Sequence, residues 1–434
     1  MHASLKTSLP SFQLSPRLKG YPHRQAPMAL EDIGAMGWNI LASDLPLPLA
    51  VLKQSALVHN VEWMQRFVQE RGIDLAPHGK TTMSAQLFAR QLDAGAWGLT
   101  FATVTQARIG VACGARRVLI ANQVLTPEDL AGIQALRAQT QDLRLVFLVD
   151  SLAQLALIEQ WFNSTSTNPH PGAFEVMLEI GVPGGRCGCR SEEEALALAQ
   201  AVHASSAVRL VGIECYEGLA AKGQTSHDEP YAQALMERVH RIAREVDLQG
   251  WFETDEVLVS AGGSAIFDLV AGRLKPSLGK PVRGLLRSGC YVTHDHGQYR
   301  RMLQAVGERC GCDETLRPAL EVWASVQSRP EPGLAILAAG RRDVSYDLEL
   351  PIPFARAAMH ERVPRAVPAS WKVVGLNDQH AHLRWHADDE AMAPIVGERI
   401  GLGISHPCTT FDKWPWMPVV DDHYQVIDAI VTQF

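Results

Sequence analysis

The chain has 434 residues, a net charge of -7, 47% hydrophobic residues and 20% charged residues. This length predicts two or three domains with a large core. The negative charge and the lack of a basic run argue against nucleic-acid binding, and the apolar runs are too short for a membrane-spanning helix. The eight scattered cysteines are typical of a reduced, cytoplasmic protein.

Residues 1–44 contain several prolines and basic residues but no apolar stretch. A signal peptide needs an apolar core, so this segment predicts an N-terminal extension instead. We expect it to pack against the second domain.

From residue 45 to 275, short β-rich runs alternate with helical runs. Eight strands that are each followed by a helix predict an α/β fold, a closed (β/α)8 TIM-type barrel. A doubly wound sheet is the alternative, but its Gly-rich dinucleotide loop is missing. The capping box Ser191–Glu194 fixes one helix start. The expected strands are 48–53, 73–76, 97–101, 117–121, 144–149, 174–180, 208–214 and 256–261.

Residues 276–434 have weak helical periodicity and many Gly, Pro and Asp turns between β-branched runs. This sequence pattern predicts a β-rich second domain. Its expected strands are 320–326, 334–338, 371–374, 382–385 and 399–404.

Lys80 lies where an apolar run ends at Pro77 and Gly79. The active site of a parallel barrel lies at the carboxyl ends of its strands, so we expect Lys80 in that site. Partial desolvation lowers the pKa of a lysine amine and makes it a nucleophile, which suits a Schiff base.

A glycine turn, Gly262-Gly263-Ser264, follows the last expected barrel strand and precedes a short helical run. Glycines there allow backbone N–H groups to approach a phosphate, and the helix dipole adds to the attraction. An ordinary turn would use the same residues; of the two interpretations, phosphate binding is favoured.

His406 and Cys408 follow the expected strand 399–404. Residues two apart in extended backbone point to one face, and nitrogen-plus-sulfur ligation favours Zn²⁺, with Mn²⁺ as the alternative. Two ligands are too few for a structural zinc, so the pair suggests an open catalytic site. A buried histidine beside an inert cysteine is the plainer interpretation.

Taken together, these motifs resemble the fold-type III pyridoxal-phosphate enzymes of the D-serine dehydratase and D-threonine aldolase group, which are related to alanine racemase. The resemblance covers roughly residues 45–412. The matching segments, in the family's order, are 77–81, 185–188, 216–218, 260–264, 289–292 and 406–410.

The resemblance implies a homodimer that binds pyridoxal 5'-phosphate and a divalent metal. It implies that Lys80 carries the cofactor as a Schiff base and acts as the catalytic base, and that Arg186 contacts the phenolic oxygen of the cofactor. The other implied roles are these: Tyr216 lines the ring, Tyr291 faces the pyridine nitrogen, Gly262, Gly263 and Ser264 hold the phosphate, and His406 and Cys408 bind the metal.

The reaction implied is a lyase reaction on a 3-hydroxy D-amino acid, with elimination to a keto acid and ammonia favoured. Retro-aldol cleavage to glycine and an aldehyde is the alternative. An amino-acid racemase and a non-catalytic pyridoxal-phosphate-binding protein are further alternatives; the first would need no metal, and the second would need no β domain.

Overall fold

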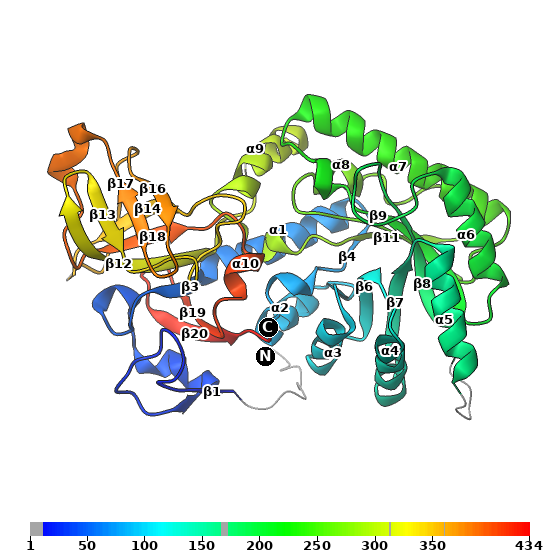
Figure 1. Ribbon diagram of the computed structural model, residues 1–434, viewed down its shortest axis with the longest axis horizontal. Helices are drawn as coiled ribbons and strands as arrows, with labels where there is room; N and C mark the ends of the chain where they lie inside the picture. Colours follow the sequence, from blue (N-terminus) through cyan, green and yellow to red (C-terminus); the bar gives the residue numbers. More distant parts are fainter. Residues whose placement is uncertain (1–11, 166–171, 312–313, 360) are drawn as a thin grey trace.

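The structure is a computed structural model that describes residues 12–165, 172–311, 314–359 and 361–434. It has two lobes (Figure 1): a parallel sheet surrounded by helices, and an antiparallel sheet domain. Within these ranges no helix is both long and apolar enough to cross a membrane.

The parallel sheet is a barrel of eight strands in the order β4-β11-β10-β9-β8-β7-β6-β5. The two end strands also meet, because Trp97 N–H donates to Leu75 O and Thr100 N–H donates to Pro77 O, both at 2.8 Å. The predicted α/β barrel is therefore confirmed. Its strands are β4 (Asp74–Leu75), β5 (Leu99–Phe101), β6 (Arg117–Gln123), β7 (Arg144–Val149), β8 (Phe174–Ile180), β9 (Val208–Cys215), β10 (Val257–Ala261) and β11 (Val282–Leu286).

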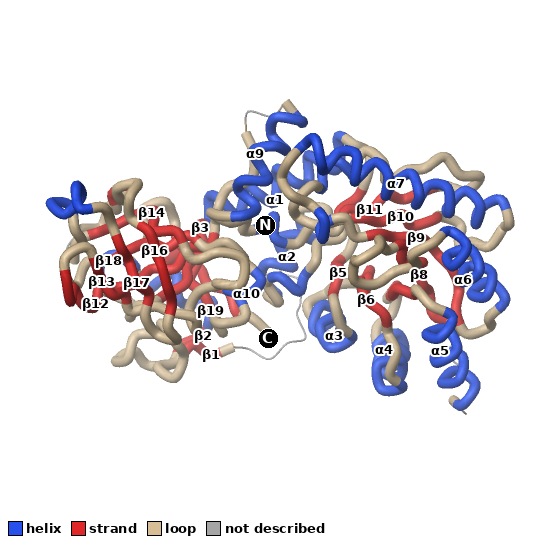
Figure 2. The backbone as a smooth tube through the Cα atoms, turned by 45° about the horizontal axis from the view of Figure 1, so that its top comes forward, coloured by secondary structure: helices blue, strands red, loops and turns tan. Residues whose placement is uncertain are grey.

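Helices cover the outside of the barrel (Figure 2), so both faces of its strands are largely buried and the strands are mostly apolar. The predicted capping box is present: the Ser191 hydroxyl accepts from Glu194 N–H, and the Glu194 carboxylate accepts from Ser191 N–H. The helices are α1 (Gln54–Glu70), α2 (Ala85–Asp93), α3 (Val104–Ala112), α4 (Pro127–Gln139), α5 (Leu152–Ser164), α6 (Glu192–Ala204), α7 (Thr225–Leu248) and α8 (Phe267–Ala271).

One strand expected in the barrel lies elsewhere. Residues 48–53 correspond to β3 (Leu49–Lys53), which pairs antiparallel with β12 (Leu320–Glu331) of the second domain. The eighth barrel strand is instead β11, which begins beyond the residue 275 boundary expected for the barrel. Both runs are short and apolar, so hydrophobic periodicity alone could not show which of them belongs to the barrel.

The second domain is β-rich, as expected, and its strand pairs are antiparallel except that of β3 with Trp416–Val420, which is parallel. The same stretch of sequence holds the one-turn helix α10 (Cys408–Phe411) and a helix that the sequence did not reveal, α9 (Gln298–Cys310). α9 lies against the barrel helices, where Arg309 pairs with Asp268 of α8 and donates to Thr225 of α7. Its other strands are β13 (Leu334–Leu337), β14 (Ile352–Ala357), β15 (Arg365–Ala366), β16 (Lys372–Leu376), β17 (Ala381–Arg384), β18 (Arg399–Gly403), β19 (Trp416–Val420) and β20 (Val426–Val431).

The described part of the N-terminal extension, residues 12–44, contacts this second domain. Lys19 Nζ lies 2.6 Å from a carboxylate oxygen of Asp343, and Trp416 Nε1 donates to Lys19 O at 2.8 Å. The extension contains β1 (Gln13–Leu14), β2 (Met28–Ala29) and the 3-10 helices η1 (Leu30–Met36) and η2 (Ile40–Ala42).

Candidate active site

A cavity of about 370 Å³ lies at the carboxyl ends of the barrel strands, where the second domain meets the barrel. Almost all of the predicted site residues line it, although they come from distant parts of the chain. They are Lys80, Arg186, Tyr216, Gly262, Gly263, Ser264, His406 and Cys408. The barrel therefore places its polar strand ends around one space.

Lys80 lies in the 3-10 helix η3 (Gly79–Thr81), which begins shortly after β4. Gly79 allows this turn to pack tightly, since a Cβ there would lie 2.5 Å from the ring of Phe101. Burial lowers the pKa of Lys80; Arg186 lowers it further, while the nearby thiol of Cys408 opposes the change. The structure thus provides the desolvated amine that a Schiff base needs.

The cavity wall holds two buried polar atoms without a partner among the described residues, His78 Nδ1 and Arg287 Nε. Arg287 is 4% exposed, and its Nη2 donates to Glu214 and to Cys215 O. Burial, followed by the charges of Lys80 and Arg287, holds the pKa of His78 well below its usual range, so its ring is neutral. A buried polar atom without a hydrogen-bond partner destabilises the fold unless a polar ligand bonds to it.

Burial raises the pKa of two carboxyl groups in the cavity wall. Burial raises the pKa of Glu214 to about 8, although Arg287 opposes the rise, and burial raises the pKa of Glu179 as well. The pKa of Tyr216 rises to about 12 because of burial and the nearby Glu217. The remaining positive charges of Lys80 and the two arginines make the cavity suitable for an anionic ligand.

The glycine turn is held by a carboxylate. The N–H groups of Gly262 and Gly263 donate to the two carboxylate oxygens of Glu217, at 3.0 and 2.6 Å. Gly262, Gly263 and Ser264 all line the cavity, and α8 begins only at Phe267. Phosphate binding by this turn stays a prediction.

We expect Glu217→Gln to disturb this turn. The glutamine carbonyl could accept only one of the two N–H groups, leaving a buried donor unsatisfied at about 1–3 kcal/mol. Urea unfolding should show that the free energy of unfolding falls by this amount. The variant should also bind pyridoxal phosphate more weakly. Glu237→Gln, at an exposed position on α7, is the matched control and should change neither.

Tyr291 is the exception among the predicted site residues. Its hydroxyl meets Gln91 Nε2 at 3.1 Å in a buried contact, and its side chain does not line the cavity. The residues of this segment that do line it are Arg287, Gly289 and Cys290. A Cβ at Gly289 would lie 2.6 Å from His78 O, so only glycine fits there. The expected role of Tyr291 stays a prediction, and Arg287 adds a buried cation to the cavity wall.

The predicted metal pair borders the same cavity. The Nδ1 atom of His406 lies 2.5 Å from Asp347 Oδ2, and Thr409 Oγ1 donates to the other oxygen of Asp347 at 2.8 Å. This contact occupies Nδ1, so Nε2 would be the nitrogen that binds a metal, as in carboxylate–histidine–zinc arrangements. Burial lowers the pKa of His406, but Cys408 and Asp347 outweigh it and raise it to about 9.

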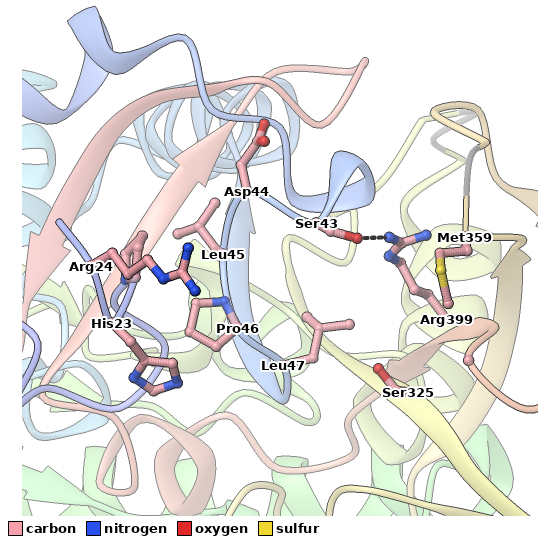
Figure 3. A pocket seen from close by; sticks show the side chains of 12 residues that line it. His23, Arg24, Ser43, Asp44, Leu45, Pro46, Leu47, Ser325, Met359 and Arg399 are labelled. Carbon is pink, nitrogen blue, oxygen red and sulfur yellow. Dashed lines mark hydrogen bonds between the residues drawn. The ribbon is translucent and has the colours of Figure 1, made fainter.

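A larger cavity of about 520 Å³ lies between the extension and the second domain. Figure 3 shows Ser43 bonded to Arg399 at its edge, with Arg24 and Asp44 also lining it. None of the predicted site residues borders this cavity, and it has no nucleophile beside a metal-binding pair. Size alone therefore does not identify the active site.

Comparisons with known proteins find matches to both parts of the chain. The family described as "Alanine racemase, N-terminal domain" matches residues 52–273, and the family described as "Putative serine dehydratase domain" matches residues 319–420. D-threonine aldolase of Arthrobacter sp is 25% identical over 380 residues, covering 86% of this chain and 89% of that protein.

Two further similarities extend over nearly the whole chain. D-threo-3-hydroxyaspartate dehydratase of Delftia sp. (strain HT23) is 29% identical over 391 residues, 86% of this chain and 93% of that protein. The crystal structure of D-threonine aldolase from Filomicrobium marinum has a TM-score of 0.76 at 23% identity and covers 91% of this chain and 96% of that one. At this identity the structural match supports the fold only.

Pyridoxal phosphate fits the residues of the cavity. Lys80 supplies the amine, while Arg287 and His78 supply unpaired buried nitrogens and Ser264 a hydroxyl. His406 and Cys408 supply the nitrogen and sulfur donors that a divalent metal such as Zn²⁺ prefers.

Proposed function

This chain belongs to the alanine racemase, N-terminal domain family, and from that membership we propose that it is a pyridoxal-phosphate- and metal-dependent lyase of 3-hydroxy D-amino acids. One observation carries the proposal: Lys80 of the barrel and the pair His406 and Cys408 of the second domain border a single cavity. A group bound at Lys80 and a metal bound at the pair could therefore act on one small substrate.

When bound, pyridoxal phosphate supplies an electron sink for charge that develops at the substrate Cα. Lys80 would hold the cofactor and would take the α-proton of the substrate, and its lowered pKa suits a base. Arg186 and Arg287 provide positive charge in the cavity wall for the anionic groups of cofactor and substrate.

The metal held by His406 and Cys408 would supply Lewis acidity at the substrate β-hydroxyl. Asp347 positions the histidine ring through its 2.5 Å contact with Nδ1. In elimination the β-hydroxyl leaves after Lys80 has taken the α-proton, and the products are a keto acid and ammonia. We favour this outcome.

Retro-aldol cleavage uses the same cavity, and relatives named as aldolases support it as the second candidate. The purified holoenzyme should be given D-serine and D-threonine separately. Ammonia with a keto acid would support elimination, while glycine with acetaldehyde would support cleavage. Inversion at Cα without bond cleavage would instead identify a racemase, and no turnover would favour a cofactor-binding protein.

The family resemblance also supports a homodimer of this chain in the cytoplasm, with Zn²⁺ as the metal. Light scattering of the purified protein measures the oligomeric state, and elemental analysis measures the metal. A monomeric protein that retains full activity would contradict the dimer.

Asp347→Asn should weaken metal binding by about 10–100-fold, because the histidine ring loses the carboxylate that orients it. Competition with a chromophoric chelator measures this affinity. Asp378→Asn, an exposed carboxylate that faces Arg342 at 3.8 Å, is the matched control. Equal affinities in both variants would show that Asp347 has no role in metal binding.

A further inference from the structure

One arginine side chain holds the loop that carries Arg186. This loop, residues 181–190, joins β8 to α6. The guanidinium of Arg190 donates to four consecutive carbonyl oxygens of the loop, at distances between 2.6 and 3.2 Å. These are the carbonyl oxygens of Gly185, Arg186, Cys187 and Gly188.

The backbone of Arg190 is itself fixed to the helices outside the barrel. Its N–H donates to Glu194 Oε2 of α6 at 2.9 Å, and its carbonyl oxygen accepts from Arg238 Nη1 of α7 at 3.3 Å. Gly181, at the start of the loop, leaves room for the guanidinium, because a Cβ there would overlap Arg190 Nη1. The side chain therefore reaches from an anchored helix start back to the loop.

The contact requires a guanidinium rather than any cation. Arginine presents its N–H donors in a planar fork, whereas a lysine ammonium is a single point charge with three donors. Hydrogen bonds from a charged donor are also stronger than those from a neutral one. We expect the loop to lose this conformation when the guanidinium is removed.

Arg186 depends on the loop for its position. Its side chain is exposed, and its Cζ lies 5.0 Å from the centroid of the Tyr216 ring. Both side chains line the cavity that contains Lys80, whereas that of Arg190 does not. A long exposed side chain has many rotamers, so its reach into the cavity is set by the backbone that carries it. We propose that Arg190 is a positioning residue that holds Arg186 toward the cavity.

This inference rests on the proposed function, in which Arg186 provides positive charge for the cofactor and substrate. Arg190 would act only through Arg186, so removing Arg190 should matter only while Arg186 is present. Two residues that act through one contact give effects that are not additive, and a double-mutant cycle measures this.

The test compares Arg190→Ala, Arg186→Ala and the double variant in the full-length protein. Each single variant should bind pyridoxal phosphate at least about tenfold more weakly, as expected for one lost charged hydrogen bond. Each should also lower kcat by about 10²-fold, since a small misplacement costs this much. The double variant should match Arg186→Ala in both properties. The pH titration of the visible absorption band should shift equally in all three variants, because each loses the same charge beside the cofactor.

Two further variants separate positioning from a general loss of stability. Arg241→Ala is the matched control, because Arg241 is an exposed arginine of α7 that donates to Glu192 of α6 outside the cavity. It should keep the cofactor affinity and kcat of the wild type. Arg190→Lys keeps the charge without the fork, so its affinity should lie between those of the wild type and Arg190→Ala. It takes the place of Arg190→Ala in the cycle if a thermal unfolding curve shows that Arg190→Ala is not folded.

The outcomes distinguish this inference from the proposed function. Losses that add in full in the double variant would overturn the inference, because Arg190 would then act independently of Arg186. An effect of Arg190→Ala no larger than that of Arg241→Ala would overturn it as well. A wild-type protein that does not bind pyridoxal phosphate would overturn the proposed function itself.

Discussion

Lys80→Ala should lower kcat by at least about 10⁴-fold, because the change removes both the amine that carries the cofactor and the base that takes the α-proton. The same variant should lose the visible absorption band that a Schiff base gives to the wild-type protein supplied with pyridoxal phosphate. Stopped assays of product formation and an absorption spectrum measure the two effects.

Lys275→Ala is the matched control, since Lys275 is an exposed lysine outside the cavity that donates only to Gly72 O, at 3.0 Å. It should keep both the band and the activity. An unchanged absorption band in Lys80→Ala would place the cofactor on another amine and would contradict the assignment of the cavity.

His406→Ala should lower kcat by about 10³-fold, because Lewis-acid stabilisation of the leaving hydroxyl is worth several kcal/mol. The variant should also bind much less zinc, while the Schiff-base band at Lys80 stays as in the wild type. Product assays, elemental analysis and absorption spectra measure these three properties on one preparation.

His203→Ala, at an exposed position in the last turn of α6, serves as its control and should bind zinc normally. Full activity of His406→Ala without zinc would favour the racemase alternative, which needs no metal.

The sequence was sufficient for the fold class and for most of the barrel. Expected strands such as 144–149 and 174–180 match β7 and β8 because buried parallel strands are continuously apolar and end at polar residues. The sequence analysis placed β3 in the barrel and missed β11 there. A short apolar run predicts a strand but does not show which strand it pairs with. Pairing is decided by tertiary packing, which no local pattern records.

The incorrect assignment of the last barrel strand also explains why a site residue was missed. Arg287 lies just after the carboxyl end of β11, so a sequence interpretation without this strand had no reason to place it in the site. Gly289 belongs to the matching segment 289–292, but that resemblance implied a role for Tyr291 only. Asp347 lies about 60 residues from His406 in sequence, and an acidic side chain in a turn gives no local signal. Glu217 was visible as a strand end, but its bonds to the glycine turn depend on the packing of β9 beside β10.

The most direct test of the account is reversible removal of the metal from the wild-type holoenzyme, with products of D-serine and D-threonine followed by NMR. We expect product formation to stop on chelation and to return when zinc is restored, while the Schiff-base band of Lys80 stays unchanged throughout. Undiminished product formation in the metal-free protein would contradict a lyase in which Lys80 and the metal act together on one substrate.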